Sequence, residues 1–195
     1  MNGLGETINE NWNSEIRFEK LPKMRIAKHI VISLNPEEEV SVYMDNWAKE
    51  SGLMDLKDYI FRSFGWDIDV DDEDKENNPN FRGYAKCITV PEDFAPKHNG
   101  VETLYMQADE YAVLRITDPF SNPFERIPGG WQKLWKYVKN SGYMPKVWDN
   151  RHSFEEVIEI DGLTYMDVYV PRQAYNNAKP RTCDICHPGG ADCCA

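Results

Sequence analysis

The sequence lacks any apolar run of 18 residues, and it does not open with a basic segment followed by an apolar one. A transmembrane helix requires such a run, and a secretory signal requires such an opening. We therefore expect a cytoplasmic protein that has no membrane partner. Cysteine is also scarce in the body of the chain, where Cys87 stands alone. This distribution excludes the disulfide framework of a small secreted fold.

Basic residues are few: 22 Lys and Arg stand against 33 Asp and Glu, which gives a formal charge of −11 and a pI near 4.8. Such a field repels polyanions unless basic side chains gather locally, and the sequence contains no basic cluster. We expect no direct nucleic-acid binding. A cationic ligand would be attracted, although an acidic surface that only maintains solubility fits the same numbers.

The short motifs of several enzyme classes are absent as well. There is no glycine-rich phosphate loop, no HExxH pair and no GxSxG turn. Nucleotide hydrolysis, zincin proteolysis and α/β-hydrolase chemistry therefore lack the geometry that they need. The four histidines are scattered along the chain. We expect no cofactor and no metal.

Cysteine is concentrated at the C-terminus instead, in a CxxCH string at 183–187 and the pair Cys193-Cys194. Five soft ligands within a dozen residues could close a tetrahedral zinc site. The interpretation that we favour is a flexible tail with reactive thiols, because Pro188-Gly189-Gly190 favours disorder.

Aromatic residues are abundant, with six Trp, ten Tyr and eight Phe. Such flat side chains can line a ligand cleft or fill a Trp-rich core, and composition does not separate the two. A length of 195 residues suits one main domain. We predict a flexible N-terminal lead over 1–13 with an anchoring role for Trp12, one domain over 14–172 and a Cys-rich flexible tail over 173–195.

Periodicity predicts an α+β fold. Residues 15–33 favour extended structure broken at Pro22, and a helix capped by Asn35 and Glu38 is expected to end at Gly52. The acidic stretch 69–80 is typical of a solvated loop. Further strands are predicted over 59–68, 82–90, 101–106, 111–116, 153–160 and 163–170, with a second helix marked by Trp131, Leu134, Trp135 and Val138 and ended at Gly142.

The two predicted helices end alike, in WAKESGLM at 47–54 and YVKNSGYM at 137–144, an offset of 90 residues (142 − 52 = 90, from the two glycines). This suggests a duplicated strand–helix–strand–strand unit, although chance use of the same helix-ending residues would look similar. Two such units would form an antiparallel sheet with two main helices on one face. The other face, or the seam between the halves, would then hold a ligand cleft.

Two adjacent carboxylates stand in the predicted strand 153–160. Glu155 and Glu156 must point to opposite faces of the sheet. We expect the face that carries Phe154 to pack on the helices, which leaves Glu155 on the other face and Glu156 at a solvent margin. Periodicity alone does not select the pocket residue, and a solvated edge charge fits either one. A carboxylate walled by aromatic rings would have a raised pKa, which suits a cation site or a general base.

An ordered set of short runs resembles the GyrI-like effector-binding domain family across about residues 14–172. The runs are Phe64-Gly65-Trp66, Gly83-Tyr84, TVPEDF at 89–94, YAVL at 111–114, Gly130-Trp131, Ser141-Gly142-Tyr143, Ser153-Phe154-Glu155 and MDVYVP at 166–171. The resemblance implies a duplicated strand–helix–strand–strand fold that binds hydrophobic and often cationic compounds.

The same resemblance assigns site residues. The family's pocket glutamate follows a Ser-Phe pair, which selects Glu155. Tyr84 and Tyr169 match wall residues, with Trp66 and Phe154 as weaker candidates. Trp131 and Trp135 lie on the helical stripe, where core packing is expected.

Two functions follow from the resemblance: sensing or sequestration of drugs and toxins, and hydrolysis of cyclopropane-bearing alkylating natural products with Glu155 directing water and Tyr169 orienting the substrate. No helix-turn-helix region is attached, so direct regulation of DNA is not expected. A separate transcriptional regulator and a second copy of the chain stay open as partners. The run Ala85-Lys86-Cys87 departs from the family, in which an acidic or bulky residue is commoner after the Gly-Tyr pair, and this weakens the expected preference for cations.

Overall fold

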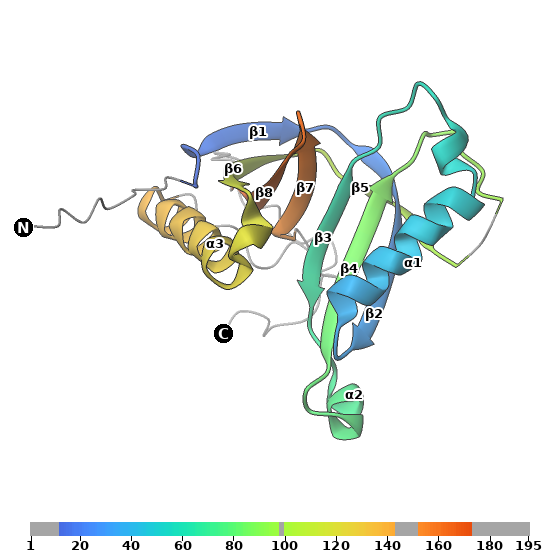
Figure 1. Cartoon of the computed structure of the whole chain (residues 1–195), viewed down its shortest axis with the longest axis horizontal. Coiled ribbons are helices and arrows are strands. Elements are labelled where there is room, and N and C mark those ends of the chain that lie inside the picture. Colours follow the sequence, from blue (N-terminus) through green and yellow to red (C-terminus); the bar gives the residue numbers. More distant parts are fainter. Residues whose placement is uncertain (1–11, 98–99, 143–151, 173–195) are drawn as a thin grey trace, which may run out of the picture.

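One curled antiparallel sheet of eight strands forms the centre of the protein, in a computed structural model that describes residues 12–97, 100–142 and 152–172 (Figure 1). The strand order is β1-β6-β8-β7-β3-β4-β2-β5. The strands are β1 (Arg17–Leu21), β2 (Met24–Ser33), β3 (Ser63–Ile68), β4 (Arg82–Thr89), β5 (Glu102–Met106), β6 (Asp109–Thr117), β7 (Phe154–Ile160) and β8 (Leu163–Pro171).

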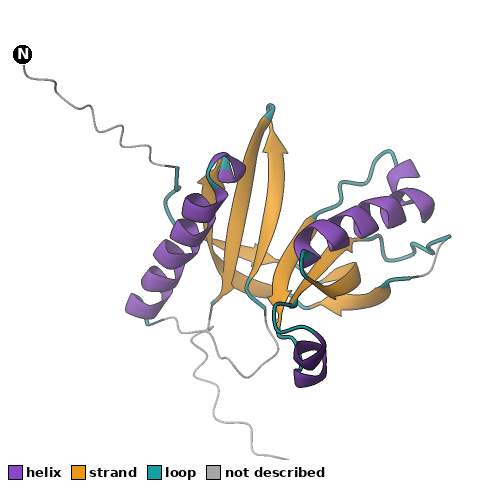
Figure 2. Ribbon diagram, turned by 60° about the horizontal axis from the view of Figure 1, so that its bottom comes forward, coloured by secondary structure: helices purple, strands orange, loops and turns teal. Residues whose placement is uncertain are grey.

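Two long helices lie apart from each other over different parts of this sheet (Figure 2). Helix α1 (Pro36–Glu50) contacts β2 and β4, and α3 (Pro123–Asn140) contacts β6 and β8. Short helical turns complete the chain: η1 (Leu53–Asp55), α2 (Asp72–Asn77) and η2 (Pro119–Ser121). No helix in the described ranges combines the length and apolarity needed to cross a membrane. The predicted α+β class is confirmed.

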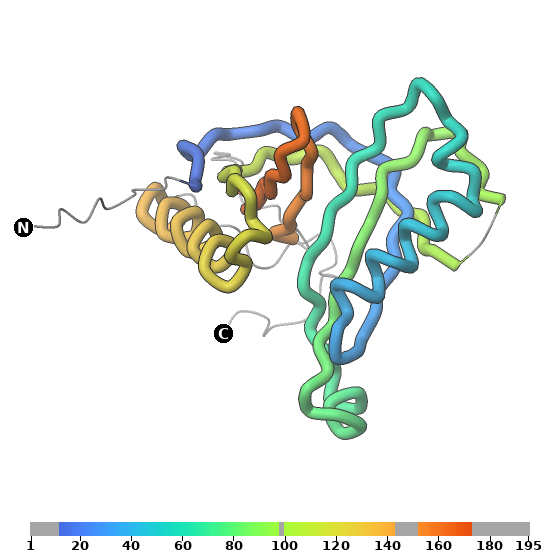
Figure 3. Tube along the Cα trace, viewed as in Figure 1, coloured from blue at the N-terminus to red at the C-terminus, as the bar shows by residue number. Residues whose placement is uncertain are grey.

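The order strand–helix–strand–strand occurs twice, as β2-α1-β3-β4 with α2 inserted and as β6-α3-β7-β8. The sheet order is symmetric about the pairing of β3 with β7. The strand that precedes each half pairs with the other half, since β1 lies beside β6 and β5 beside β2 (Figure 3). These exchanged edge strands tie the halves together at both margins of the sheet.

At its centre the sheet is narrow. Strand β7 pairs with β8 over seven residues, but β3 and β7 share only two residue pairs, Phe64 with Glu156 and Gly65 with Glu155. Because successive side chains alternate between faces, the first pair points to one side of the sheet and the second to the other. We call these two pairs the seam.

The inner face of the curl is filled by aromatic rings. Phe154 stacks on Tyr169 with ring centroids 4.6 Å apart and meets Phe64 edge-on at 5.0 Å. All three side chains are buried. The expectation that the Phe154 side of its strand packs on the helices is therefore wrong. The helices cover the other face, because residues from both halves of the curled sheet pack against one another on its inner face.

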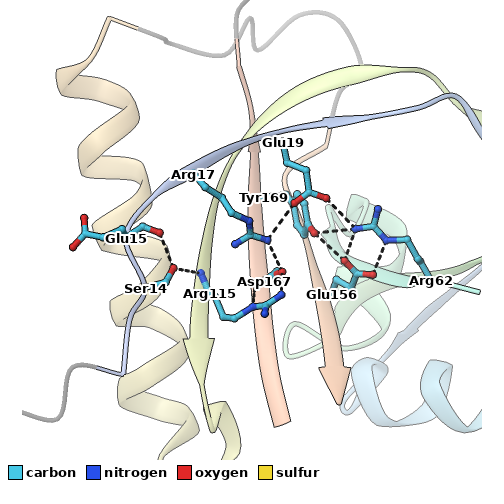
Figure 4. A network of polar contacts seen from close by, with 9 residues as sticks. All are labelled: Ser14, Glu15, Arg17, Glu19, Arg62, Arg115, Glu156, Asp167 and Tyr169. Carbon is cyan, nitrogen blue, oxygen red and sulfur yellow. Dashed lines mark hydrogen bonds and ion pairs between the residues drawn. The ribbon is translucent and has the colours of Figure 1, made fainter. Parts of the chain in front are cut away.

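A chain of ion pairs crosses the same inner face (Figure 4). Arg62 donates two hydrogen bonds to Glu156, at 2.8 and 2.6 Å, and Tyr169 donates to the same carboxylate at 2.9 Å. Asp167 accepts from Arg115 and Arg17. Burial alone would raise the pKa of Asp167, but these two guanidinium groups lower it below its usual value. Glu156 is thus a buried and paired carboxylate, not one at a solvent margin.

The second helix begins earlier than predicted, at Pro123, and contains Pro128-Gly129-Gly130. The two glycines are needed for packing. A Cβ atom at Gly130 would lie 2.4 Å from Cδ1 of Ile116, and one at Gly129 would lie 2.5 Å from the Trp12 ring. Close contact with Trp12 and with Ile116 of β6 therefore favours glycine at these two positions inside the helix.

The structure differs from two further expectations, a solvated loop over residues 69–80 and a side-chain cap at Asn35. The acidic stretch contains the short helix α2, capped by the Asp71 side chain, which accepts from the Asp74 N–H at 2.9 Å. Asn35 makes no side-chain cap for α1; its N–H instead donates to Ser33 Oγ, which bonds Glu39. Asx-type caps compete among neighbouring residues, and the sequence does not select between them.

The seam generates a stability prediction. In Arg62→Met, Glu156 keeps its burial but loses the guanidinium, so the free energy of unfolding should fall by about 2 to 3 kcal/mol. This is below the range for a fully enclosed pair because Arg62 is 29% exposed. Urea-induced unfolding measures this loss in the free energy of unfolding. The control is Arg82→Met, which breaks an exposed pair with Glu37 and should cost below about 1 kcal/mol. Equal losses would contradict the assigned role of Arg62.

Candidate functional site

A cleft of about 1070 Å³ lies between α1 and α3, above the seam. Its floor is the helix-facing side of β3, β4 and β7, and its walls come from both helices. The register places Glu155 of β7 beside Gly65 of β3, and Gly65 in turn beside Lys86 of β4. These three residues form one row across the floor, and the side chains of Glu155 and Lys86 are on the same face. Of the two positions predicted for a cleft, the seam between the halves is the one at which this cleft lies.

A close contact between the halves occupies the middle of this floor. The Tyr84 hydroxyl donates to Oε1 of Glu155 at 2.5 Å. Tyr84 comes from β4 and Glu155 from β7, so the tyrosine ring must cross β3 to make this bond. It crosses at Gly65, where an added Cβ would lie 2.2 Å from the hydroxyl oxygen and 2.7 Å from two ring carbons. Gly65 is a glycine because the Tyr84 ring takes the space of its side chain.

The electrostatic state of Glu155 is set by opposing effects. Burial raises the pKa of Glu155 above its usual value, and hydrogen bonds from Tyr84 and Trp131 oppose that rise. The charges of Asp67 and Glu37 raise the pKa of Glu155 further. Burial, followed by the Glu155 charge, raises the pKa of Tyr84 strongly, so its hydroxyl stays protonated and donates. The floor therefore presents a partly desolvated carboxylate with two donors already directed at it.

The remaining charges of the cleft are mostly acidic. Arg82 is held by two hydrogen bonds from its guanidinium to Glu37 at the rim. Burial and the charge of Glu37 raise the pKa of Asp67, and Arg82 opposes this. Asp45 of α1 borders the cleft with its side chain exposed. Arg82 and Glu37 neutralise each other. Among the other lining residues, the acidic groups Glu155, Asp67 and Asp45 outnumber the basic group Lys86.

The structure brings together some of the predicted site residues and separates others. Tyr84 and Glu155 are in contact in the cleft. Trp66 and Phe154 lie on strands that border it, but their rings pack on the inner face of the curl, where Trp66 stacks on His152. Tyr169 lies on that inner face as well, bonded to Arg62 and Glu156. It does not reach Glu155, because residues 155 and 156 point to opposite faces.

Two tryptophans of α3 contribute to the site although core packing was expected of them. Trp131 and Trp135 border the cleft while they pack against the cluster beneath α3. Trp131 also bonds the Glu155 carboxylate. Helical periodicity places both on the inward stripe but cannot tell a ring that is buried against a sheet from one that stands over a cavity. The one signal in the sequence that could have placed Trp131 at the site is the Gly130-Trp131 run, which belongs to the family resemblance.

The family can now be stated. The family model of the GyrI-like small molecule binding domain matches residues 14–173. The chain belongs to this family. Its predicted membership is confirmed.

Comparison with curated protein sequences gives no match. Among solved structures, the C-terminal domain of EcmrR has a TM-score of 0.58 at 12% identity, over 82% of this chain and 97% of that domain. The EcmrR–DNA complex has a TM-score of 0.55 at 10% identity, over 83% of this chain and 57% of that one. SAV2435 bound to tetraphenylphosphonium has a TM-score of 0.49 at 11% identity, over 82% of this chain and 94% of that one. This GyrI-like chain thus spans little more than half of the EcmrR chain.

Within the described ranges, no group of three or more His, Cys, Asp or Glu side chains is arranged to hold a metal ion. The CxxCH string and the final cysteine pair lie outside those ranges. Cys87 is free and buried, and burial raises the pKa of its thiol to about 12. It packs as a small apolar side chain in the inner core and is closed to solvent chemistry.

The raised pKa of Glu155 generates a prediction on pH. A folded-state pKa above the ordinary value of 4.5 means that the folded chain is destabilised as pH rises from about 4.5 through the raised value. Glu155→Gln does not titrate. The variant should therefore gain stability relative to the wild type across that interval, and the difference should level off on either side. Thermal melts at about pH 4 to 8 measure it, and a difference that stays constant contradicts the assignment.

Proposed function

We propose that the cleft of this GyrI-like protein binds small hydrophobic compounds, including cationic ones, and that Glu155 holds the ligand. The role would be sensing or sequestration of drugs and toxins. The observation that carries the proposal is the Glu155 carboxylate, bonded by Tyr84 and Trp131 on the floor of a cleft with aromatic walls. The proposal includes one binding domain over 14–172, built from two duplicated halves.

Charge and surface in the cleft support this ligand class. A desolvated carboxylate gains more from a nearby positive charge than a hydrated one does, because the local dielectric is lower. Trp131, Trp135 and Tyr84 offer ring faces, which attract cations and bury apolar surface. A volume of about 1070 Å³ in an open cleft is enough for a drug-sized molecule.

The Tyr84–Glu155 bond gives the site a means of response. The two residues belong to different halves, whose central strands β3 and β7 pair with each other at two positions. A ligand group that takes the place of the Tyr84 hydroxyl would release the tyrosine ring and alter the contact between the halves. Such a change is what a sensor domain requires. In EcmrR a domain of this fold is part of a longer chain bound to DNA. For the present protein, a transcriptional regulator would receive the change.

Binding can be measured through tryptophan emission. Tetraphenylphosphonium should quench the fluorescence at micromolar concentration, because Trp131 and Trp135 border the cleft. Glu155→Gln should weaken binding about tenfold, the scale of one interaction with a charged group. Glu159→Gln is the matched control, because it removes the same charge from an exposed position of the same strand that does not line the cleft, and it should bind as the wild type does. If no lipophilic compound binds, or if the two variants bind alike, the proposed site is wrong.

Hydrolysis of cyclopropane-bearing alkylators is the second candidate, favoured by the raised pKa of Glu155, which suits a general base. Glu155 would take a proton from water as the water oxygen bonds to a ring carbon. The ring C–C bond breaks, its electron pair passes into the conjugated carbonyl system, and that system gains the proton. One water is added in total. The family resemblance would have Tyr169 orient the substrate, but its place on the inner face leaves Tyr84 for that role.

Mass spectrometry after incubation with a cyclopropane-bearing alkylator tests the reaction. Addition of one water by the wild type, with a loss of about a hundredfold or more in Glu155→Gln, is the expected result for general-base catalysis. Tyr84→Phe keeps the carboxylate and loses the hydroxyl, so it should retain part of the activity. No turnover by the wild type, or full turnover by Glu155→Gln, would leave binding as the function.

A further inference from the structure

Lys86 occupies a distinctive place in the cleft. It pairs with Gly65 on one side of β3, and Glu155 pairs with Gly65 on the other side. Alternation along β4 puts Lys86 on the same face as Tyr84 and Ile88, toward the cleft that all three border. Neighbouring strands lie about 4.8 Å apart, so the Cα atoms of Lys86 and Glu155 are separated by about 10 Å across the floor.

The Lys86 ammonium is unpaired within the described part of the chain: it has no hydrogen bond or ion pair there. The other cleft cation, Arg82, is committed to Glu37. Lys28, on the inner face of the sheet, is committed to Glu102 at 2.8 Å. Lys86 is half-buried at the border of the cleft, and its charge has no partner among the residues that the structure describes. A ligand in the cleft would supply one.

We propose that Lys86 determines ligand specificity: the cleft selects compounds that carry a negative or hydrogen-bond-accepting group in addition to a positive one. This inference rests on the proposed function and names its ligand class. The positive or donor group faces Glu155, the accepting group faces Lys86, and an apolar body lies over the Tyr84 ring between them. A compound with positive charge alone places that charge near an unpaired ammonium, which costs affinity. The preferred ligands are therefore amphoteric aromatic molecules.

A pair of dyes that differ in a single group tests this class. Rhodamine B is a zwitterion at neutral pH, and its ethyl ester has the same ring system and positive charge without the carboxylate. The wild type should bind rhodamine B more tightly than the ester in fluorescence anisotropy. Lys86→Met keeps the stem length and removes the charge. It should weaken rhodamine B binding about tenfold, the scale of a hydrogen bond to a charged group, and leave ester binding equal or tighter.

Control variants separate a local effect from a general one. Lys49→Met changes net charge equally at an exposed position of α1 away from the cleft, and it should leave both affinities unchanged. Lys86→Arg keeps the charge and should keep the preference for rhodamine B. If Lys86→Met is not folded by circular dichroism, Lys86→Gln replaces it with the same expected loss.

The outcomes distinguish this inference from the proposed function beneath it. If both dyes bind the wild type equally and Lys86→Met changes neither, the role of Lys86 is overturned while the cleft remains a binding site. The same conclusion holds if Lys49→Met shifts the preference as much as Lys86→Met does. If neither dye nor tetraphenylphosphonium binds, the proposed function fails and this inference fails with it. A preference reversed by Lys86→Met and kept by Lys86→Arg supports it.

Discussion

The two residue pairs between β3 and β7 constrain the rest of the molecule, because they are all of the pairing at the sheet centre between the halves as far as the structure describes the chain. Backbone pairing this short is weak by itself. Side chains reinforce each pair from a different face. On the helix side, Tyr84 bonds Glu155; on the inner side, Arg62 bonds Glu156. The first contact lies in an open cleft, where a ligand can compete for it. The second is part-buried beside the aromatic cluster, where Arg62 and Tyr169 both bond the Glu156 carboxylate.

The contact between Tyr84 and Glu155 on the helix side of the seam depends on one glycine. A side chain at Gly65 would occupy the space of the Tyr84 ring, so the bond across the seam and the open floor of the cleft both require its absence. The same glycine separates Glu155 from Lys86 in the row across the floor. Opposite charges therefore stand on either side of a flat aromatic surface. A rigid inner face supports this arrangement, as a binding site needs for its first contacts.

The sequence predicted the elements well because strands and turns are local features. Positive φ angles of 51° and 78° at Asp161 and Gly162 make the turn between β7 and β8, as that dipeptide indicates. Family runs selected Glu155. The face of Phe154 was misassigned because each face of β7 carries a glutamate and an apolar residue near the seam, and period-two alternation does not say which face meets a helix. Tyr169 was expected at the cleft and lies on the inner face, whereas Trp131 was expected in the core and borders the cleft. Only the strand register shows which rings share a face with Glu155.

Glu155 is suited to a selective site because neither its neutral nor its charged form is strongly favoured. Burial favours its neutral form, whereas Tyr84 and Trp131 favour the charged form, so neither state is strongly fixed without a ligand. A positive group in the cleft would tip the balance toward the carboxylate and would have to displace or share the Tyr84 hydroxyl. Lys86, unpaired within the described residues and about 10 Å away along the row, then decides which positive ligands are acceptable. In the proposed site, Glu155 would supply the affinity for positive charge and the opposing ammonium would discriminate among charged compounds, since specificity depends on a repulsive element as well as an attractive one.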